Sequence, residues 1–224
     1  MTAPSAYPVP GPAERVRWAS QRRHESDYIF DFWTAFGWTL LSCGLFSFYI
    51  VYQLVRRMRD HNLRRLELLD AANTLAWERA VAAGREDELR GRFERVAASL
   101  GVLRQMTTDF RDPGIWLVLV LVGSSIAQVV LYVLLDGDLV KHGAAEASAE
   151  WELASIYSDL GAPLGHLPPA APKAAHRYAP RILALIGSCG IYGLWWLYDM
   201  MVEPNRHFQR DWAWEDGFMA AALA

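Results

Sequence analysis

Six histidines and two cysteines are the residues of this sequence that could hold a metal ion or act as a nucleophile or general base. None of the histidines falls in an HxxxH, HExxH or Cys/His pattern, and the sequence has no Walker loop and no GxSxG motif. Cys43 and Cys189 show neither a disulfide framework nor metal-type spacing, so we interpret both as small helix-packing residues. The sequence therefore predicts no catalytic residue and no cofactor, and we expect that the protein is not an enzyme.

An internal repeat singles out two of the histidines. The segment 42–52 recurs at 188–198, where Ser, Cys, Gly and Tyr are repeated without a gap. The same register pairs His61 with His207 and Arg64 with Arg210. Both copies lie in long apolar runs, so we interpret the repeat as a repeat of membrane helices. A histidine pair at the inner face could bind a metal ion or a phosphate. The alternative is that His61 and His207 are separate interfacial anchors.

The charged residues, which are 21% of the chain, are strongly segregated. Three windows are almost free of charge, and Trp residues gather at their ends, where amphipathic rings favour the membrane–water boundary. We therefore expect an all-α integral membrane protein with three transmembrane helices, at 34–55, 113–135 and 180–202. At 1.5 Å per residue, 22 residues rise about 33 Å, enough to cross a hydrocarbon core of about 30 Å.

The segments between these windows are predicted from their patterns. We expect a disordered tail and interfacial segment at 1–33, a cytoplasmic helical hairpin at 56–112, an extracytoplasmic loop with one short amphipathic helix at 136–179, and a cytoplasmic tail at 203–224. Apolar residues in the hairpin follow alternating steps of three and four around a turn at Gly84, which favours a coiled-coil seam. The seam residues are Leu66, Leu69, Asn73, Leu89, Phe93, Val96, Leu100 and Leu103. The alternative is two separate helices on the bilayer surface.

Small and polar residues inside the predicted spans indicate helix–helix contacts. Glycine allows close approach between membrane helices, and a mid-bilayer Gln needs a hydrogen-bond partner. The residues assigned to helix packing are Gly44, Gly123, Gln128, Gly187, Gly190 and Gly193. We expect the two copies of the repeat to run parallel and to meet through their glycines.

The second copy, Ser188-Cys189-Gly190-Ile191-Tyr192-Gly193-Leu194-Trp195-Trp196-Leu197-Tyr198, resembles the transmembrane motif of a family of small bacterial inner-membrane proteins known only as a domain of unknown function. The first copy departs from that motif, with Leu45, Ser47 and Tyr49 at its Ile, Gly and Trp positions. The resemblance implies a membrane location, and that family has no established activity to transfer.

The distribution of Lys and Arg favours the N-terminus outside and the 56–112 hairpin and C-terminus in the cytoplasm of a plasma (inner) membrane. A cluster that follows the first window could contact anionic lipids: Arg56, Arg57, Arg59, Arg64 and Arg65. A nucleic-acid partner is not expected, because acidic residues interrupt this basic face. We predict a non-enzymatic scaffold or accessory subunit that forms a homo-oligomer or binds a membrane protein. The alternative is an oligomeric small transporter or channel.

Overall fold

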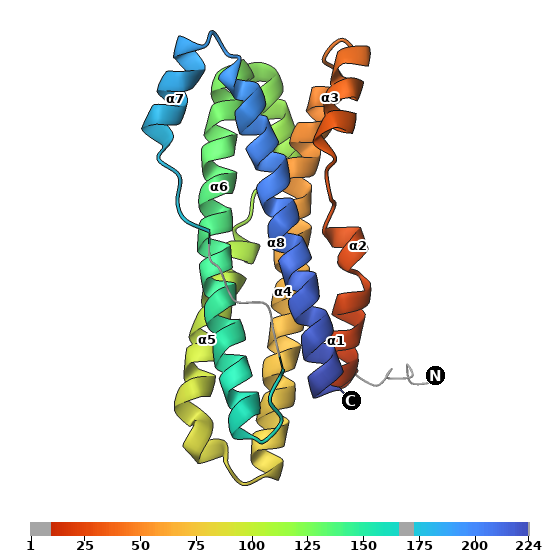
Figure 1. The fold of residues 1–224 in the computed structure, drawn as a ribbon, viewed down its shortest axis with the longest axis vertical. Coiled ribbons are helices and arrows are strands. Elements are labelled where there is room, and N and C mark those ends of the chain that lie inside the picture. The colour runs from red at the N-terminus through yellow and green to blue at the C-terminus, as the bar shows by residue number, and fades with distance from the viewer. Residues whose placement is uncertain (1–9, 166–172, 224) are drawn as a thin grey trace, which may run out of the picture.

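The computed structural model describes residues 10–165 and 173–223, and every regular element in this part of the chain is a helix, which confirms the all-α prediction. The helices are α1 (Pro12–Gln21), α2 (Arg23–Ser26), α3 (Phe32–Leu41), α4 (Phe46–Ala82), α5 (Glu86–Thr108), α6 (Pro113–Asp159), α7 (Tyr178–Gly187) and α8 (Tyr192–Ala222). They form an elongated bundle in which α4, α6 and α8 run along the long axis (Figure 1).

Each of the three expected transmembrane helices is interrupted near its middle by a reversal of the chain. Between α3 and α4 the reversal uses Cys43 and Gly44, whose φ angles are 51° and 91°. Between α7 and α8 it uses Cys189 and Gly190, at 50° and 92°. Helix α6 contains a kink at Ser124, where φ is 53° and ψ is −141°. These angles lie outside the right-handed helical region, so none of the three apolar windows forms one continuous helix.

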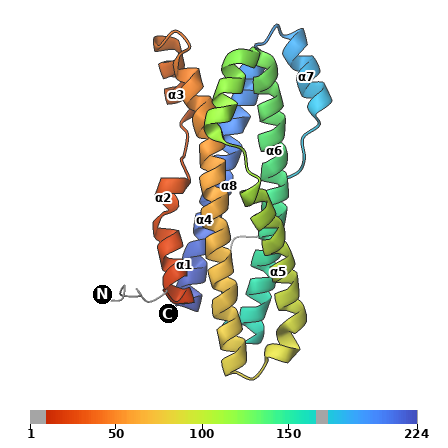
Figure 2. The ribbon, with the colours of Figure 1, turned by 180° about the vertical axis from the view of Figure 1, so that it is seen from behind.

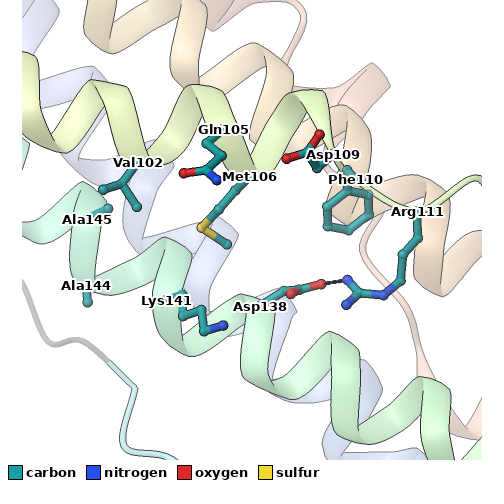
Figure 3. A pocket seen from close by; sticks show the side chains of 10 residues that line it. All are labelled: Val102, Gln105, Met106, Asp109, Phe110, Arg111, Asp138, Lys141, Ala144 and Ala145. Atoms are coloured by element: carbon teal, nitrogen blue, oxygen red, sulfur yellow. Dashed lines mark hydrogen bonds and ion pairs between the residues drawn. The ribbon is translucent and has the colours of Figure 1, made fainter.

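Ion pairs across the second and third windows show that the chain turns back. Arg111 pairs with Asp138, as Figure 3 shows, although a straight helix from 113 to 138 would extend about 37 Å. Arg181 pairs with Asp199 at 2.8 Å across the turn between α7 and α8. Among the helices of the described residues, α6 alone is long and apolar enough to cross a membrane, by length and composition, and it is kinked at Ser124. The prediction of three transmembrane helices is therefore wrong, because each window folds into a hairpin of two arms.

The three hairpins share one plan and point the same way. In each, the first arm begins eleven residues before the left-handed residue, at Phe32, Pro113 and Tyr178. Asp31 and Asp112 cap the first two arms by accepting hydrogen bonds from backbone N–H groups, and Arg177 stands at the same place in the third. The three turns lie at one end of the molecule, and the α4–α5 turn lies at the other (Figures 1 and 2). The hairpin plan therefore occurs three times, although the sequence repeat occurs twice.

The second arms extend well past the predicted boundaries. Residues 136–159, expected as a loop, continue α6, because this segment buries Leu153 and Ile156 against α5. Residues 203–222, expected as a tail, continue α8. Part of the expected N-terminal tail forms α1, whose Val16 and Ala19 are buried in the core cluster that α4 shares; residues 1–9 lie outside the described part. Amphipathic faces that find a partner extend these helices past the apolar windows.

Pro204 lies inside α8 rather than at its end. Because proline has no backbone N–H, the carbonyl of Met200 lacks its helical donor. The guanidinium of Arg57 on α4 supplies a donor, with Nη2 2.5 Å from Met200 O and 3.2 Å from Met201 O. Arg57 therefore satisfies the interrupted backbone of α8, and it is buried there instead of contacting lipid.

Two apolar clusters fill the bundle, one on each side of a layer of buried charged residues. The cluster nearer the turns joins α4, α6 and α8 through residues such as Leu54, Leu131 and Trp196. The cluster nearer the α4–α5 turn contains most of the predicted hairpin seam: Leu69, Leu89, Phe93, Val96, Leu100 and Leu103 are buried, while Leu66 and Asn73 are partly buried. Helix α5 packs on α6 as well as on α4, so the predicted hairpin is not an independent unit.

Candidate metal centre

Three histidines meet in the polar layer between the two apolar clusters. His61 on α4, His142 on α6 and His207 on α8 each stand eighteen residues past the left-handed residue of their hairpin. Their ring centroids form a nearly equilateral triangle with sides of 5.3, 5.4 and 5.8 Å. Three hairpins with the same plan thus deliver three imidazoles to one level of the bundle, about 27 Å from the turns along the second arms.

The Nε2 atoms of the three histidines converge on the carboxylate of Glu146. His142 and His207 approach it at 3.1 and 3.0 Å, and His61 at 3.9 Å. One ligand atom from each of these four residues can be chosen so that all lie within 4.8 Å of one another. Asp211 completes the group, with Oδ2 3.5 Å from His61 Nε2 and 3.3 Å from His207 Nε2. Glu146 and Asp211 each lie one helical turn beyond a histidine of the triangle, on the same helix face.

These ligand atoms are buried and lack ordinary hydrogen bonds. The side chains of His61, His142, Glu146 and Asp211 are fully buried, and His207 is 9% exposed. The three Nε2 atoms, Glu146 Oε2 and Asp211 Oδ2 have no hydrogen-bond partner among the residues that the structure describes. Buried polar atoms are normally satisfied, so a converging set whose mutual contacts of 3.0–3.9 Å lack hydrogen-bond geometry fits an ion. Three imidazoles and one carboxylate are a typical ligand set for Zn²⁺ and related divalent transition metals.

Asp27, at the C-terminal cap of α2 (Arg23–Ser26), fixes the orientation of His61. The Nδ1 atom of His61 lies 3.0 Å from Asp27 Oδ1, and because a carboxylate only accepts, Nδ1 carries the proton and Nε2 is left free to ligate. Asp27 also accepts hydrogen bonds from Arg64 Nη2 and Trp212 Nε1, both at 2.6 Å. Burial raises the pKa of Asp27, but His61 and Arg64 outweigh it and hold the pKa well below its usual range.

The protonation of the histidines follows from their surroundings. Burial lowers the pKa of His61 and outweighs the neighbouring carboxylates, so His61 is neutral near pH 7, the form that binds a metal. Burial also lowers the pKa of His207, but Asp211 and Glu146 outweigh it and raise that pKa above the ordinary value. The pKa of Glu146 is held well below its ordinary value, since His142 and His207 outweigh the effect of burial. The site therefore keeps an ionised carboxylate beside the histidines.

Two arginines that were expected at the lipid surface are buried next to this centre. Arg65 contacts Glu146 at 2.9 Å and Glu215 at 3.2 Å and also pairs with Glu150. Arg64 contacts Glu215 at 2.7 Å. The lipid assignment of Arg57, Arg64 and Arg65 is wrong, because buried acids and unpaired carbonyls attract these guanidinium groups into the bundle. Arg56 and Arg59 remain partly exposed, and each pairs with Asp60.

A second cluster of possible ligands, formed by Asp136, His176 and Glu203, is a different case. Lys173 pairs with Asp136 and lies 2.5 Å from Glu203 Oε2, so its ammonium group already neutralises both carboxylates. His176 Nδ1 and Tyr178 also contact Asp136, at 2.9 and 2.8 Å. In this ion-pair network the ammonium group of Lys173 already stands between the two carboxylates, and we assign no metal to it.

Two of the cavities among the described residues bear on the choice of site. A cavity of about 250 Å³ borders the metal centre through His207 and is also lined by Leu139, Gly143, Lys173, Glu203, Arg206 and Arg210. A larger one of about 680 Å³ lies between the end of α5 and α6, where Figure 3 shows Arg111 reaching Asp138. The larger cavity is lined by none of the histidines, and its ion pair is internal, so we assign it no site.

The glycines assigned to helix packing serve a different purpose. Gly44 and Gly190 occupy left-handed positions in the turns, and an added Cβ would meet nothing within 4 Å, so their close-packing role is wrong. An added Cβ at Gly187 would also meet nothing within 4 Å. A Cβ added at Gly123 would lie 2.9 Å from Ala127 Cβ, and one added at Gly193 would lie 3.2 Å from Leu185 Cδ1, each within the same hairpin. Gln128 donates to Tyr132 Oη at 2.7 Å on its own helix, not across helices.

Sequence reasoning found His61 and His207 but missed His142, Glu146, Asp211 and Asp27. The signal for His142 was present, because Asp112 and His142 have the same spacing as Asp31 and His61. The α6 hairpin lacks the Ser-Cys-Gly turn sequence of the other two, so the sequence repeat does not reveal it. Comparisons of the chain with protein-family models, with curated proteins and with solved structures found no match. The resemblance of the repeat to a family of small membrane proteins stays a prediction.

Proposed function

We propose that this protein is a membrane-associated scaffold whose three helical hairpins are held together by one divalent transition-metal ion. The convergence of His61, His142, His207 and Glu146, with their ligand atoms buried and unsatisfied among the described residues, carries this proposal. Four protein ligands complete a tetrahedral Zn²⁺ sphere, which is the arrangement of structural rather than catalytic sites. The ion would join α4, α6 and α8 at a level where their own packing is polar.

Membrane association is supported by the surface of the hairpins. Most of the large exposed hydrophobic side chains lie on them, such as Trp33, Leu41, Val122 and Ile191. Contiguous exposed apolar surface of this kind marks a site of protein or membrane interaction. The proposals of a membrane-protein partner, of homo-oligomerisation and of an oligomeric transporter or channel stay predictions.

A titration of the chelator-treated protein in detergent tests the metal proposal. We expect Co²⁺ to bind at one ion per chain with the visible absorption of a tetrahedral N/O site, and Zn²⁺ to displace it. Because the ion binds only the folded state, Zn²⁺ at 100 times Kd should stabilise the protein by about 2.7 kcal/mol. Absence of both the absorption band and the rise in Tm would contradict the proposal.

Matched histidine variants separate the two candidate clusters. His142→Ala removes one ligand of the proposed centre, and Glu146→Gln changes another without altering its size. We expect both to abolish the Co²⁺ band and the Zn²⁺-dependent rise in Tm. His176→Ala removes the histidine of the second cluster and should leave both signals as in the wild type. If His176→Ala lost the Co²⁺ band and His142→Ala kept it, the ion would belong to the cluster of Asp136, His176 and Glu203, and the proposal would be contradicted.

A further inference from the structure

We propose that the three hairpin tips, defined as the turns at Cys43, Ser124 and Cys189 with their flanking apolar residues, insert into the acyl layer of a single leaflet and do not cross the membrane. Both ends of every hairpin then lie on the same side of the bilayer, together with the metal centre. The inference rests on the proposed membrane association but is independent of the proposed metal ion.

The length of the arms fits one leaflet. Helices α3 and α7 contain ten residues each, and the first arm of α6 runs from Pro113 to the kink at Ser124. At 1.5 Å per residue, these arms rise about 15–17 Å, which is half of a hydrocarbon core of about 30 Å. A hairpin of this size reaches the middle of the bilayer and returns.

The three tips expose apolar side chains at equivalent positions. Two residues past the left-handed residue stand Leu45, Ile126 and Ile191, each more than two-thirds exposed. Three residues before it, Leu40, Leu121 and Ile186 are also exposed. No charged residue occurs in 32–55 or 113–135, and Arg181 and Asp199 of the third hairpin neutralise each other at 2.8 Å. One continuous apolar end of the molecule therefore faces outward.

The backbone of the two repeated turns is satisfied internally, as hydrocarbon requires. Ser42 Oγ accepts a hydrogen bond from Phe46 N, and Ser188 Oγ accepts one from Tyr192 N, both at 2.9 Å. The N–H groups of Gly44 and Gly190 donate to carbonyls of the preceding arms at 2.8 and 2.9 Å. These turns can therefore enter hydrocarbon without leaving backbone polar groups unpaired. A loop in water does not need such internal hydrogen bonds.

Basic side chains follow the apolar arms where the lipid headgroups would lie. Arg56, Lys141, Arg177 and Arg206 are exposed and belong to all three hairpins. The exposed acids Asp31 and Asp112 stand at the starts of the first arms, so charged groups of both signs mark where the apolar surface ends and the headgroups would begin. Arm length and apolar exposure thus agree on one occupant of this end, the acyl chains of one leaflet.

Cysteine labelling in sealed membrane vesicles of known orientation tests this geometry. Cys43 and Cys189 are natural probes at the tips, and Asp87→Cys and Ser158→Cys in a Cys43→Ser/Cys189→Ser background report on the far ends of α5 and α6. We expect an impermeant maleimide to label positions 87 and 158 from the same side. The tip cysteines should react from neither side until detergent is added.

Each other outcome contradicts the proposal in a distinct way. Labelling of 87 and 158 from opposite sides would show that α6 crosses the bilayer. Rapid labelling of the tip cysteines in intact vesicles would place the tips in water. The tip cysteines could also be protected while brominated acyl chains fail to quench the fluorescence of Trp38 and Trp195. That result would show that a protein partner or a second copy covers this surface. Release of the protein by alkaline carbonate would contradict membrane association itself, and the Co²⁺ titration is unaffected by all four results.

Discussion

The first and third hairpins have the same backbone plan but opposite charges around it. Helices α3 and α7 and helices α4 and α8 begin at positions that differ by the 146 residues of the sequence repeat, and both hairpins carry their histidine at the same place. Around that frame, Asp27 corresponds to Lys173, Arg57 to Glu203, and Arg65 to Asp211. The duplicated backbone places the ligands, while the diverged side chains decide what surrounds each one.

This difference makes a nearly threefold site asymmetric. His61 is enclosed, with Asp27 holding its Nδ1 atom, whereas His207 borders a cavity of about 250 Å³. Lys173, the counterpart of Asp27, contacts Asp136 and Glu203 instead of a histidine of the centre. The buried charges also become complementary between hairpins, because an arginine in one copy meets acids contributed by the others. Different side chains at equivalent positions thus give the two copies different partners.

The largest expected difference between the two copies is at Arg57 and Glu203. Arg57→Met should destabilise the protein by about 2 kcal/mol, because it leaves the Met200 carbonyl buried without a hydrogen-bond donor. Pro204 has no N–H to donate to that carbonyl. Glu203→Gln changes a partly exposed group and should cost about 1 kcal/mol or less. Urea unfolding in detergent measures both values.

A double-mutant cycle sharpens this prediction. Pro204→Ala restores a backbone N–H at position 204, which can donate to Met200 O. Arg57→Met should therefore cost less in the Pro204→Ala background than in the wild type. Equal costs in the two backgrounds would mean that Arg57 does not act through the interrupted helix.

The next effect concerns the residue that orients each histidine. Asp27→Asn should weaken Zn²⁺ binding about 10- to 100-fold, as is typical for the loss of a carboxylate that supports a metal-bound histidine. Lys173→Gln, at the equivalent position of the third hairpin, should change the affinity little, because Lys173 touches none of the proposed ligands. Competition with a chromophoric chelator measures both, and equal losses would remove the proposed asymmetry.

The smallest effect should be the same in both copies. Gly44→Ala and Gly190→Ala place a side chain in the left-handed region, which costs roughly 1–2 kcal/mol each, although there is room for the Cβ. Gly37→Ala and Gly187→Ala, inside the first arms, should be neutral or slightly stabilising, because alanine is the better helix former. Thermal unfolding of the four variants would contradict the common turn if Gly44 and Gly190 behaved unlike each other.

Much of the candidate site could have been predicted only by recognising the hairpin that α6 forms. Gly84 was correctly placed at a turn, and each apolar window begins within two residues of a helix start, because left-handed glycines and uncharged runs are local signals. The same windows were read as spans because hydropathy measures how apolar a segment is, not whether it is straight. Gly44 and Gly190 in two of the reversals were interpreted as packing residues, and Cys43, Ser124 and Cys189 carry no strong turn preference of their own.

The amino-acid sequence by itself determined that the chain is helical, which segments are apolar, and that two copies of one motif carry His61 and His207. These properties depend on periodicity, composition and spacing, which are local. Only the tertiary structure decided that the α6 hairpin supplies His142 and Glu146, that Arg64 and Arg65 turn inward, and that Asp27 reaches His61 from 34 positions away. Such contacts join segments that are distant in the chain, so they form only when the packed helices bring these side chains to the same level.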